Sequence, residues 1–243
     1  MQRLPDLEEE ALLWKQGSAF VFGVDEAGRG CLAGPVCAAV SCWAPLGPGE
    51  ALPVPVRDSK LMREKDRERA FAPIQERALA FGVGFASAAE IDRWNILRAN
   101  YLAVGRALEC ALAMLPGPMD PSQCSFLTDG SHPLVSRAGF FAGMAEYESE
   151  FPRLKALFAG RIAEKPVVKG DGKVFSIAAA SVLAKVSRDR RMKELCAELP
   201  GYDFSVHKGY GTAKHLESLR RLGPSPEHRR TFAPVTEVLG DTK

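Results

Sequence analysis

The amino-acid sequence predicts an α/β fold, a sheet covered by helices. Short apolar runs alternate with longer segments of helical periodicity along the chain. The length of 243 residues fits one large domain with a small appendage. Apolar residues make up 46% and charged residues 26% of the chain, which excludes disordered, collagen-like and coiled-coil proteins.

Five short apolar runs are predicted to be strands. They are bounded by glycine, proline or acidic residues, and their lengths suit buried strands. Three of them lie shortly before an aspartate. In order, the runs cover residues 20–24, 36–43, 81–85, 125–128 and 166–168.

The segments between these runs have helical patterns. Residues 63–80 are charged and read as a surface helix, and residues 177–195 begin with small side chains and end with basic ones. From Trp94 onward, apolar residues advance by threes and fours, which is one face of a long amphipathic helix. After about residue 202 we expect a loop, one short helix over 212–222 and a tail.

The net charge of +2 hides an asymmetry between the two parts of the chain. Residues 1–150 carry 14 Lys/Arg against 20 Asp/Glu, whereas residues 151–243 carry 18 against 10. A basic C-terminal third favours an acidic partner such as nucleic acid, although a solvated charged surface explains the excess equally well.

The sequence contains no sign of a membrane span or a secretory signal. No apolar stretch of about 18 residues occurs, and the N-terminus is acidic by Glu10. The six cysteines are scattered and form no CxxC pair, so neither a thiolate metal site nor a disulfide framework is expected. We expect a cytoplasmic protein in which Cys31, Cys37 and Cys42 act as small hydrophobic residues.

Acidic residues recur at the ends of the apolar runs. Asp25 with Glu26, Asp129 and Asp171 each follow a short apolar segment. Ends of neighbouring strands converge at one edge of an α/β sheet, and carboxylates gathered there repel one another unless a cation lies between them. Oxygen ligands of this kind suit Mg²⁺ or Mn²⁺. Ordinary turn or capping residues remain the alternative for each acid taken singly.

Two phosphate-binding motifs are incomplete. Residues 28–33 read G-x-G-x-x-A after a strand, but Pro35 and a β-favouring run follow where a dinucleotide-binding fold needs a helix. This argues against a nicotinamide-dependent enzyme using Gly28, Gly30 and Ala33. The segment 170–173 lacks the first glycine and the final Ser or Thr of a P-loop, so that interpretation fails.

Seven motifs, in one consistent order over roughly residues 20–235, resemble the ribonuclease HII family. The first, Gly23-Val24-Asp25-Glu26-Ala27-Gly28-Arg29-Gly30 followed by Gly34-Pro35-Val36, is the most specific. The others are Asp58-Ser59-Lys60; Ile91-Asp92 with Asn95-Ile96; Asp129-Gly130; Lys169-Gly170-Asp171 with residues 176–181 and 184–189; residues 207–212 (His-Lys-Gly-Tyr-Gly-Thr); and residues 228–235.

The resemblance implies a ribonuclease H-like fold: a mixed five-stranded sheet flanked by helices, with a small helical C-terminal extension. It divides the chain into an N-terminal segment (1–19), a catalytic domain (20–200) and an extension (201–243) that contributes to substrate binding. The long gap between Asp129 and Asp171 suggests an insertion over residues 131–164, which should pack against the domain because it contains several large apolar residues.

The resemblance also implies an activity. It indicates an endoribonuclease that cuts RNA in RNA–DNA hybrids and at single ribonucleotides embedded in duplex DNA, serving ribonucleotide removal in replication and repair. Two divalent ions, Mg²⁺ or Mn²⁺, would act in hydrolysis and leave a 3′-hydroxyl and a 5′-phosphate. We expect a monomer with no motif for docking to a sliding clamp. A catalytically silent hybrid-binding module is the alternative, and the presence of all four carboxylates argues against it.

The resemblance also implies which residues form the site. The implied metal ligands are Asp25, Glu26, Asp129 and Asp171. The turn made by Gly28, Arg29 and Gly30 would contact the ribose 2′-hydroxyl, and Tyr210 would bind that hydroxyl while packing on the next deoxyribose. Candidate phosphate contacts are Lys60, Lys185 and Arg188, for which ordinary surface charge is the alternative. Asp189 is expected to be an ion-pair partner within its helix.

Overall fold

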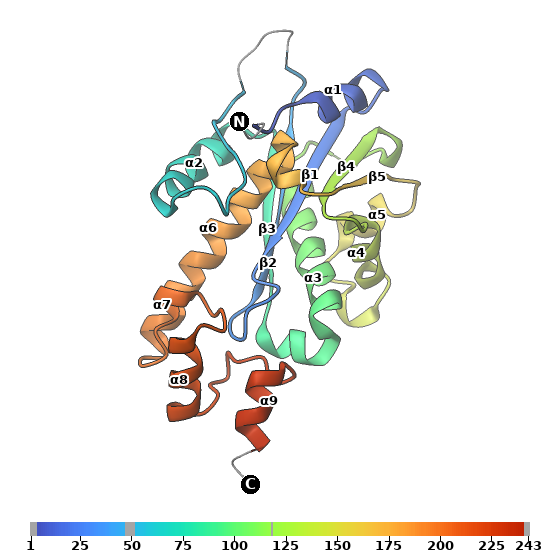
Figure 1. Ribbon diagram of the computed structural model, residues 1–243. Coiled ribbons are helices and arrows are strands. Elements are labelled where there is room, and N and C mark those ends of the chain that lie inside the picture. Colours follow the sequence, from blue (N-terminus) through green and yellow to red (C-terminus); the bar gives the residue numbers. More distant parts are fainter. Residues whose placement is uncertain (1–3, 47–51, 118, 241–243) are drawn as a thin grey trace.

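Five strands form one mixed sheet at the centre of the molecule (Figure 1). The computed structural model describes residues 4–46, 52–117 and 119–240. The strands are β1 (Phe20–Ala27), β2 (Val36–Trp43), β3 (Ala80–Ala86), β4 (Cys124–Asp129) and β5 (Ala163–Val167), in the order β3-β2-β1-β4-β5. β2 runs antiparallel to β1 and β3, and β4 runs parallel to β1 and β5. The predicted α/β fold is therefore confirmed.

Helices cover both faces of this sheet. One face carries α3, α4 and α5, and the other carries α2 and α6 (Figure 1). The helices are α1 (Glu8–Lys15), α2 (Glu64–Arg77), α3 (Ala88–Ala113), α4 (Val135–Ala142), α5 (Pro152–Leu157), α6 (Phe175–Glu198), α7 (Phe204–His207), α8 (Ala213–Leu222) and α9 (Ala233–Gly240), with 3₁₀ turns η1 (Pro121–Gln123), η2 (Ala145–Tyr147) and η3 (Gly170–Gly172).

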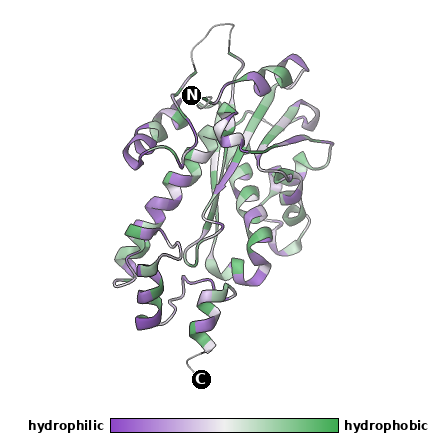
Figure 2. Cartoon of the chain, in the orientation of Figure 1, coloured by the Kyte–Doolittle hydropathy of each residue, from purple (hydrophilic) through white to green (hydrophobic). Residues whose placement is uncertain are grey.

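Successive side chains of β2 point to opposite faces of the sheet and so contribute to two separate core layers. Ala38 and Val40 belong to the cluster beneath α3, whereas Cys37, Ala39 and Trp43 pack with α2 and α6. Successive side chains of a strand point to opposite faces, so a strand buried on both sides is apolar throughout. Figure 2 shows the result, with hydrophobic residues along the central strands and hydrophilic ones on outer helices such as α2.

Two predicted elements differ from the observed ones. The last strand lies earlier than expected, since β5 ends at Val167 and Val168 lies outside the strand with 56% of its surface exposed. The predicted helix after Trp94 is the larger part of α3, which begins at Ala88 and contains a break at Asn95 (φ 63°). The Asn95 side chain accepts hydrogen bonds from the backbone N–H groups of Leu97 and Arg98, so it caps the helix that follows the break.

The segment over 131–164 packs against the domain, as predicted. It forms α4, η2 and α5, and its side chains Phe141, Phe151 and Leu154 are buried in the core with α3. Two carboxylates from outside these helices fix them: Glu164 accepts hydrogen bonds from three backbone N–H groups at the start of α4, and Glu109 from two at the start of α5. β5 begins at Ala163, inside the expected insertion.

The C-terminal extension contains more helix than the sequence predicts. α8 matches the expected short helix, but the expected loop contains α7 and the expected tail contains α9. Asp92 of α3 fixes this extension by accepting hydrogen bonds from the backbone N–H groups of Arg230 (3.0 Å) and Thr231 (2.9 Å).

The burial of three cysteines agrees with the sequence analysis. Cys31, Cys37 and Cys42 are all buried. Burial raises the pKa of the Cys37 thiol and raises that of Cys42 to about 12, so both act as apolar side chains. Among the described helices, none combines the length and the apolar character that crossing a membrane requires.

Candidate active site

Three of the predicted carboxylates meet beside the central strands. Asp25 lies in the second half of β1, Asp129 ends the neighbouring parallel strand β4, and Asp171 lies in η3 just before α6. One oxygen from each lies within 4.8 Å of the others. The convergence expected at the ends of neighbouring strands is thus present in the structure.

Close packing between α6 and β1 sets this geometry. A Cβ atom on Gly23 would lie 2.1 Å from the carbonyl carbon of Ser176, so only glycine lets the start of α6 approach the strand this closely. η3 precedes α6 directly and therefore lies next to the end of β4. There the backbone N–H of Gly170 donates a hydrogen bond to Asp129 Oδ1 over 2.6 Å, which orients that carboxylate.

Positive charge compensates only part of the repulsion among the three carboxylates. Asp25 is buried, and its pKa lies well above the ordinary value because of burial and the charges of Glu26 and Asp129. Burial and the charge of Asp129 also raise the pKa of Asp171, while the Lys60 ammonium opposes this shift. A divalent cation among these oxygens would relieve the repulsion, and an all-oxygen donor set fits Mg²⁺ or Mn²⁺.

Glu26 is the predicted ligand that lies outside the set of mutually close oxygens. Its Oε1 accepts a hydrogen bond from Arg29 over 3.1 Å, and its side chain is 15% exposed. Burial raises the pKa of Glu26, and the Arg29 guanidinium opposes that shift. Glu26 therefore lies beside the cluster with a cationic partner from the predicted ribose-contacting turn.

Lys60 and Lys185 lie near the site in different environments. Lys60 Nζ lies 3.3 Å from Asp171 Oδ2, and its side chain is 71% exposed. Lys185 Nζ lies 2.7 Å from Asp189 Oδ1 and 5.8 Å from the centre of the Tyr210 ring. The predicted ion pairing of Asp189 within its helix is therefore present, with Lys185, and Arg67 of α2 is a second partner at 3.7 Å.

Arg188 corrects an expectation from the sequence. Its guanidinium is fully buried and donates hydrogen bonds to the backbone carbonyls of Pro35 (2.8 Å), Lys208 (2.8 Å) and Ala33 (3.1 Å). A phosphate contact for Arg188 is thus wrong, because the side chain is fully buried and each of its three nitrogens already donates to a backbone carbonyl. Its role is to join the segment after the Gly28–Gly30 turn to the C-terminal extension.

Arg229 is a residue that the sequence analysis missed. It is fully buried and donates to the carbonyls of Gly28 (2.7 Å), Arg29 (2.8 Å) and Gly34 (3.0 Å). Burial lowers the pKa of Arg229 to about 10, and the neighbouring Arg188 acts in the same direction. Arg229 thus fixes the backbone of the turn and Arg188 the segment that follows it, with Arg29 and Gly30 left exposed.

Tyr210 lies close to this turn. The backbone N–H of Leu32 donates to the carbonyl of Gly209 over 2.8 Å, and Cys31 Sγ donates to the carbonyl of Lys208 over 3.6 Å. The Tyr210 side chain is 43% exposed. Segments far apart in sequence thus present an accessible aromatic ring next to an accessible glycine turn.

Asn100 is a second residue that sequence reasoning missed. It lies buried in α3, and its amide is close enough to Glu26 to lower the pKa of that carboxyl group. A polar residue at the spacing of Leu97 and Val104 on an apolar helix face was the available signal.

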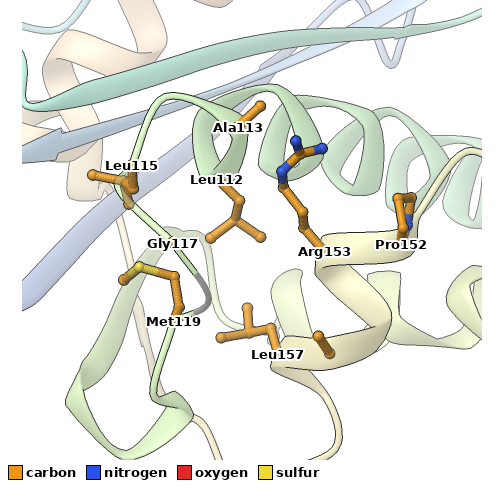
Figure 3. A pocket seen from close by; sticks show the side chains of 9 residues that line it. Leu112, Ala113, Leu115, Gly117, Met119, Pro152, Arg153 and Leu157 are labelled. Atoms are coloured by element: carbon orange, nitrogen blue, oxygen red, sulfur yellow. The ribbon is translucent and has the colours of Figure 1, made fainter.

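A separate hollow of about 470 Å³ lies at the other end of β4, between α3 and α5 (Figure 3). Its walls are mainly apolar, with Leu112, Leu115, Met119 and Leu157 among them. The Arg153 guanidinium at this hollow lies 3.1 Å from Glu109 Oε1 and is therefore already paired. The carboxylate cluster, and not this hollow, is the candidate active site.

Comparison with known proteins decides the family. The ribonuclease HII family model matches residues 22–120 and 145–235, and the unmatched stretch between them contains Asp129. The chain is 44% identical over 236 residues to ribonuclease HII of Desulfitobacterium hafniense (strain Y51), covering 96% of this chain and 76% of that protein. Ribonuclease HII of Dehalococcoides mccartyi is 40% identical over 97% of this chain and 96% of its own.

The chain belongs to the ribonuclease HII family. It is accordingly an endoribonuclease of RNA–DNA hybrids and a hydrolase. Solved structures support the fold: the ribonuclease H2 from Pyrococcus horikoshii OT3 aligns with a TM-score of 0.62 at 22% identity, over 91% of this chain and 98% of that one. Bst-RNase HIII in complex with Mn²⁺ aligns with a TM-score of 0.67 at 19% identity, over 95% and 72%. The ribonuclease H-like fold is thus shown.

Proposed function

We propose that this chain hydrolyses the phosphodiester at a ribonucleotide with two divalent metal ions, leaving a 3′-hydroxyl and a 5′-phosphate. The observation that carries the proposal is the mutual approach of Asp25, Asp129 and Asp171, with one oxygen of each within 4.8 Å of the others. Three carboxylates this close, two of them buried, need a cation for charge balance.

The proposed metal ligands are Asp25, Asp129, Asp171 and Glu26. Metal ions held by such carboxylates supply an activated water and stabilise the leaving oxygen of an in-line displacement. Glu26 is available as the fourth ligand because its partner Arg29 is 47% exposed, and ion pairs at exposed positions are weak. The identity of the ions, Mg²⁺ or Mn²⁺, is a proposal from the all-oxygen donor set.

The proposed ribose recognition combines Tyr210 with the turn of Gly28, Arg29 and Gly30. A glycine turn lets backbone groups approach a sugar closely, and the 2′-hydroxyl is the group that distinguishes RNA from DNA. The Tyr210 hydroxyl would bind the 2′-oxygen while its ring packs on the next sugar. A deoxyribose fits that ring better than a ribose, which favours a ribonucleotide followed by DNA.

The proposed substrates are therefore RNA–DNA hybrids and single ribonucleotides embedded in duplex DNA, and the proposed role is ribonucleotide removal during replication and repair. Lys60 and Lys185 are the proposed phosphate contacts, and the C-terminal extension contributes to binding through Tyr210. We also propose that the chain acts in the cytoplasm as a monomer.

Cleavage of a duplex with one ribonucleotide in the presence of Mg²⁺ tests this function. Asp25→Asn and Asp129→Asn should reduce kcat by at least about 100-fold, because an amide keeps the shape but loses the charge that holds the metal. Binding of the uncleaved duplex should survive. Asp120→Asn is the matched control, since Asp120 is an exposed turn residue bonded to Ser122.

Near-normal turnover in Asp25→Asn would contradict the metal-centred mechanism. Absence of cleavage by the unsubstituted protein, with retained hybrid binding, would instead favour the silent binding module.

A further inference from the structure

Three of the four histidines in the chain form a buried cluster beneath Tyr210. His207, His215 and His228 make up this imidazole cluster, which joins α7, α8 and the segment before α9. The rings of His207 and His215 stack with centres 4.2 Å apart, and those of His215 and His228 are 5.2 Å apart. The metal site makes no use of these side chains.

Hydrogen bonds to the backbone fix where the protons lie on two of the rings. His207 Nδ1 accepts from the Gly209 N–H (3.2 Å), so Nε2 carries the proton and donates to the Tyr202 carbonyl (2.7 Å). His228 Nδ1 accepts from the Ser225 N–H (3.0 Å), so Nε2 carries its proton.

The third ring links His228 to Tyr210. His215 Nδ1 lies 2.9 Å from the Tyr210 carbonyl oxygen, which can only accept, so this nitrogen donates. His215 Nε2 therefore has a free lone pair, and it accepts from His228 Nε2 over 3.1 Å. A directed chain of hydrogen bonds thus runs from Ser225 through His228 and His215 to the Tyr210 backbone.

The surroundings keep all three rings neutral. Burial lowers the pKa of both His215 and His228 to about 4. Burial also lowers the pKa of His207. Asp203 and Lys214, which pair with each other over 3.0 Å, act on that pKa in opposite directions. Tyr202 also contacts the cluster, with its ring centre 5.0 Å from that of His228.

Two adjacent cations are directed away from the cluster. Lys208 Nζ donates to the Ser205 carbonyl, and Arg229 donates to the turn carbonyls described above. Within the described residues, no carboxylate makes an ion pair with any of the three imidazoles.

We propose that the imidazole cluster is a positioning device for Tyr210, with His215 as the residue that holds it. The Tyr210 backbone makes three hydrogen bonds: its N–H donates to the backbone carbonyl of His207 (2.9 Å), and its carbonyl accepts from the Thr212 N–H (2.8 Å) and from His215 Nδ1 (2.9 Å). The bond from His215 is the one of these three that an imidazole donates. The ring itself stays accessible. The functional part of this inference rests on the proposed recognition of ribose by Tyr210.

The proton positions provide a test that needs no substrate. Imidazole NMR of the ¹⁵N-labelled full chain at neutral pH should show His215 as the Nδ1–H tautomer and both His207 and His228 as the Nε2–H tautomer. His132, which is exposed, supplies the reference signal. A charged imidazole in the cluster at neutral pH, or an Nε2–H tautomer at His215, would overturn the proposed chain.

Kinetics with a rescue variant test the positioning role. His215→Phe keeps an aromatic ring but loses the donor, so kcat/KM on a single-ribonucleotide duplex should fall about five- to tenfold. The uniform RNA–DNA hybrid should be less affected. His215→Asn places an amide donor where Nδ1 lies and should recover activity, whereas a purely structural role predicts no such rescue. Val206→Ala, at an exposed position of α7, is the control.

Tyr210→Ala separates the two possible failures. If Tyr210→Ala changes the ratio of the two substrates and His215→Phe does not, the positioning inference alone is overturned. If Tyr210→Ala leaves that ratio unchanged, the recognition role in the proposed function is wrong, and the functional part of this inference fails with it.

Discussion

Gly28 and Gly30 occupy the same short turn, yet the structure predicts opposite responses to alanine. Gly28 has φ of +91°, and a Cβ atom there would lie 1.9 Å from Arg188 Nε. Gly30 has no atom within 4 Å of the corresponding position and no left-handed backbone. Gly28→Ala should therefore unfold more easily than the unsubstituted chain, whereas Gly30→Ala should not.

The expected decrease in the free energy of unfolding of Gly28→Ala has two parts. A left-handed backbone costs an alanine about 1 kcal/mol relative to glycine. The larger part is the displacement of the buried Arg188 guanidinium, which bonds to three backbone carbonyls. Each buried acceptor left without a partner costs about 1–3 kcal/mol, and part of the set should survive. The total is about 3–5 kcal/mol, a large fraction of the stability of a domain.

Urea unfolding followed by circular dichroism measures this difference. Gly28→Ala should shift the midpoint strongly at an unchanged slope, and Gly30→Ala should stay within about 0.5 kcal/mol. Cleavage assays then add a second comparison, because Gly30→Ala should fold normally but lose activity if its backbone approaches the ribose. Equal stability of the two variants would refute the argument that Arg188 packs under Gly28 for a structural purpose.

Three further predictions concern other buried or charged groups. Arg229→Met should lower the free energy of unfolding by about 3–5 kcal/mol, because the carbonyls of Gly28, Arg29 and Gly34 lose their donors. An unchanged urea midpoint would contradict this role. Glu10 is buried and accepts from the Ser176 N–H, and burial raises its pKa from 4.5 to about 7. Because the folded chain favours the neutral form of Glu10, the free energy of unfolding should fall as pH rises between about 4.5 and 7. Urea titrations across this range should show that Glu10→Gln removes about 2–3 kcal/mol of that fall. If Lys185 contacts a phosphate, Lys185→Ala should reduce the slope of log duplex affinity against log salt concentration by about one. An unchanged slope would mean that Lys185 contacts no phosphate and serves as an ion-pair partner of Asp189.

Much of the fold and part of the site could be predicted from the sequence, because those features are local. Strand and helix patterns repeat every two or 3.6 residues, so β1 and β4 were predicted nearly at their observed places. These patterns also predict Asp25 and Asp129 as candidate site residues, because each lies at or near the end of an apolar run. The motifs around them were also specific enough to predict the family.

Only the tertiary structure decided which charged side chains are accessible. Arg188 and Lys185 lie in the same basic helix, yet the first is buried against backbone carbonyls and the second lies beside Tyr210. Arg229 is 201 residues from Gly28, so no local pattern could reveal that it holds the turn. The sequence shows which side chains are charged. Whether a charged side chain is buried depends on carbonyl groups that distant segments bring together on folding.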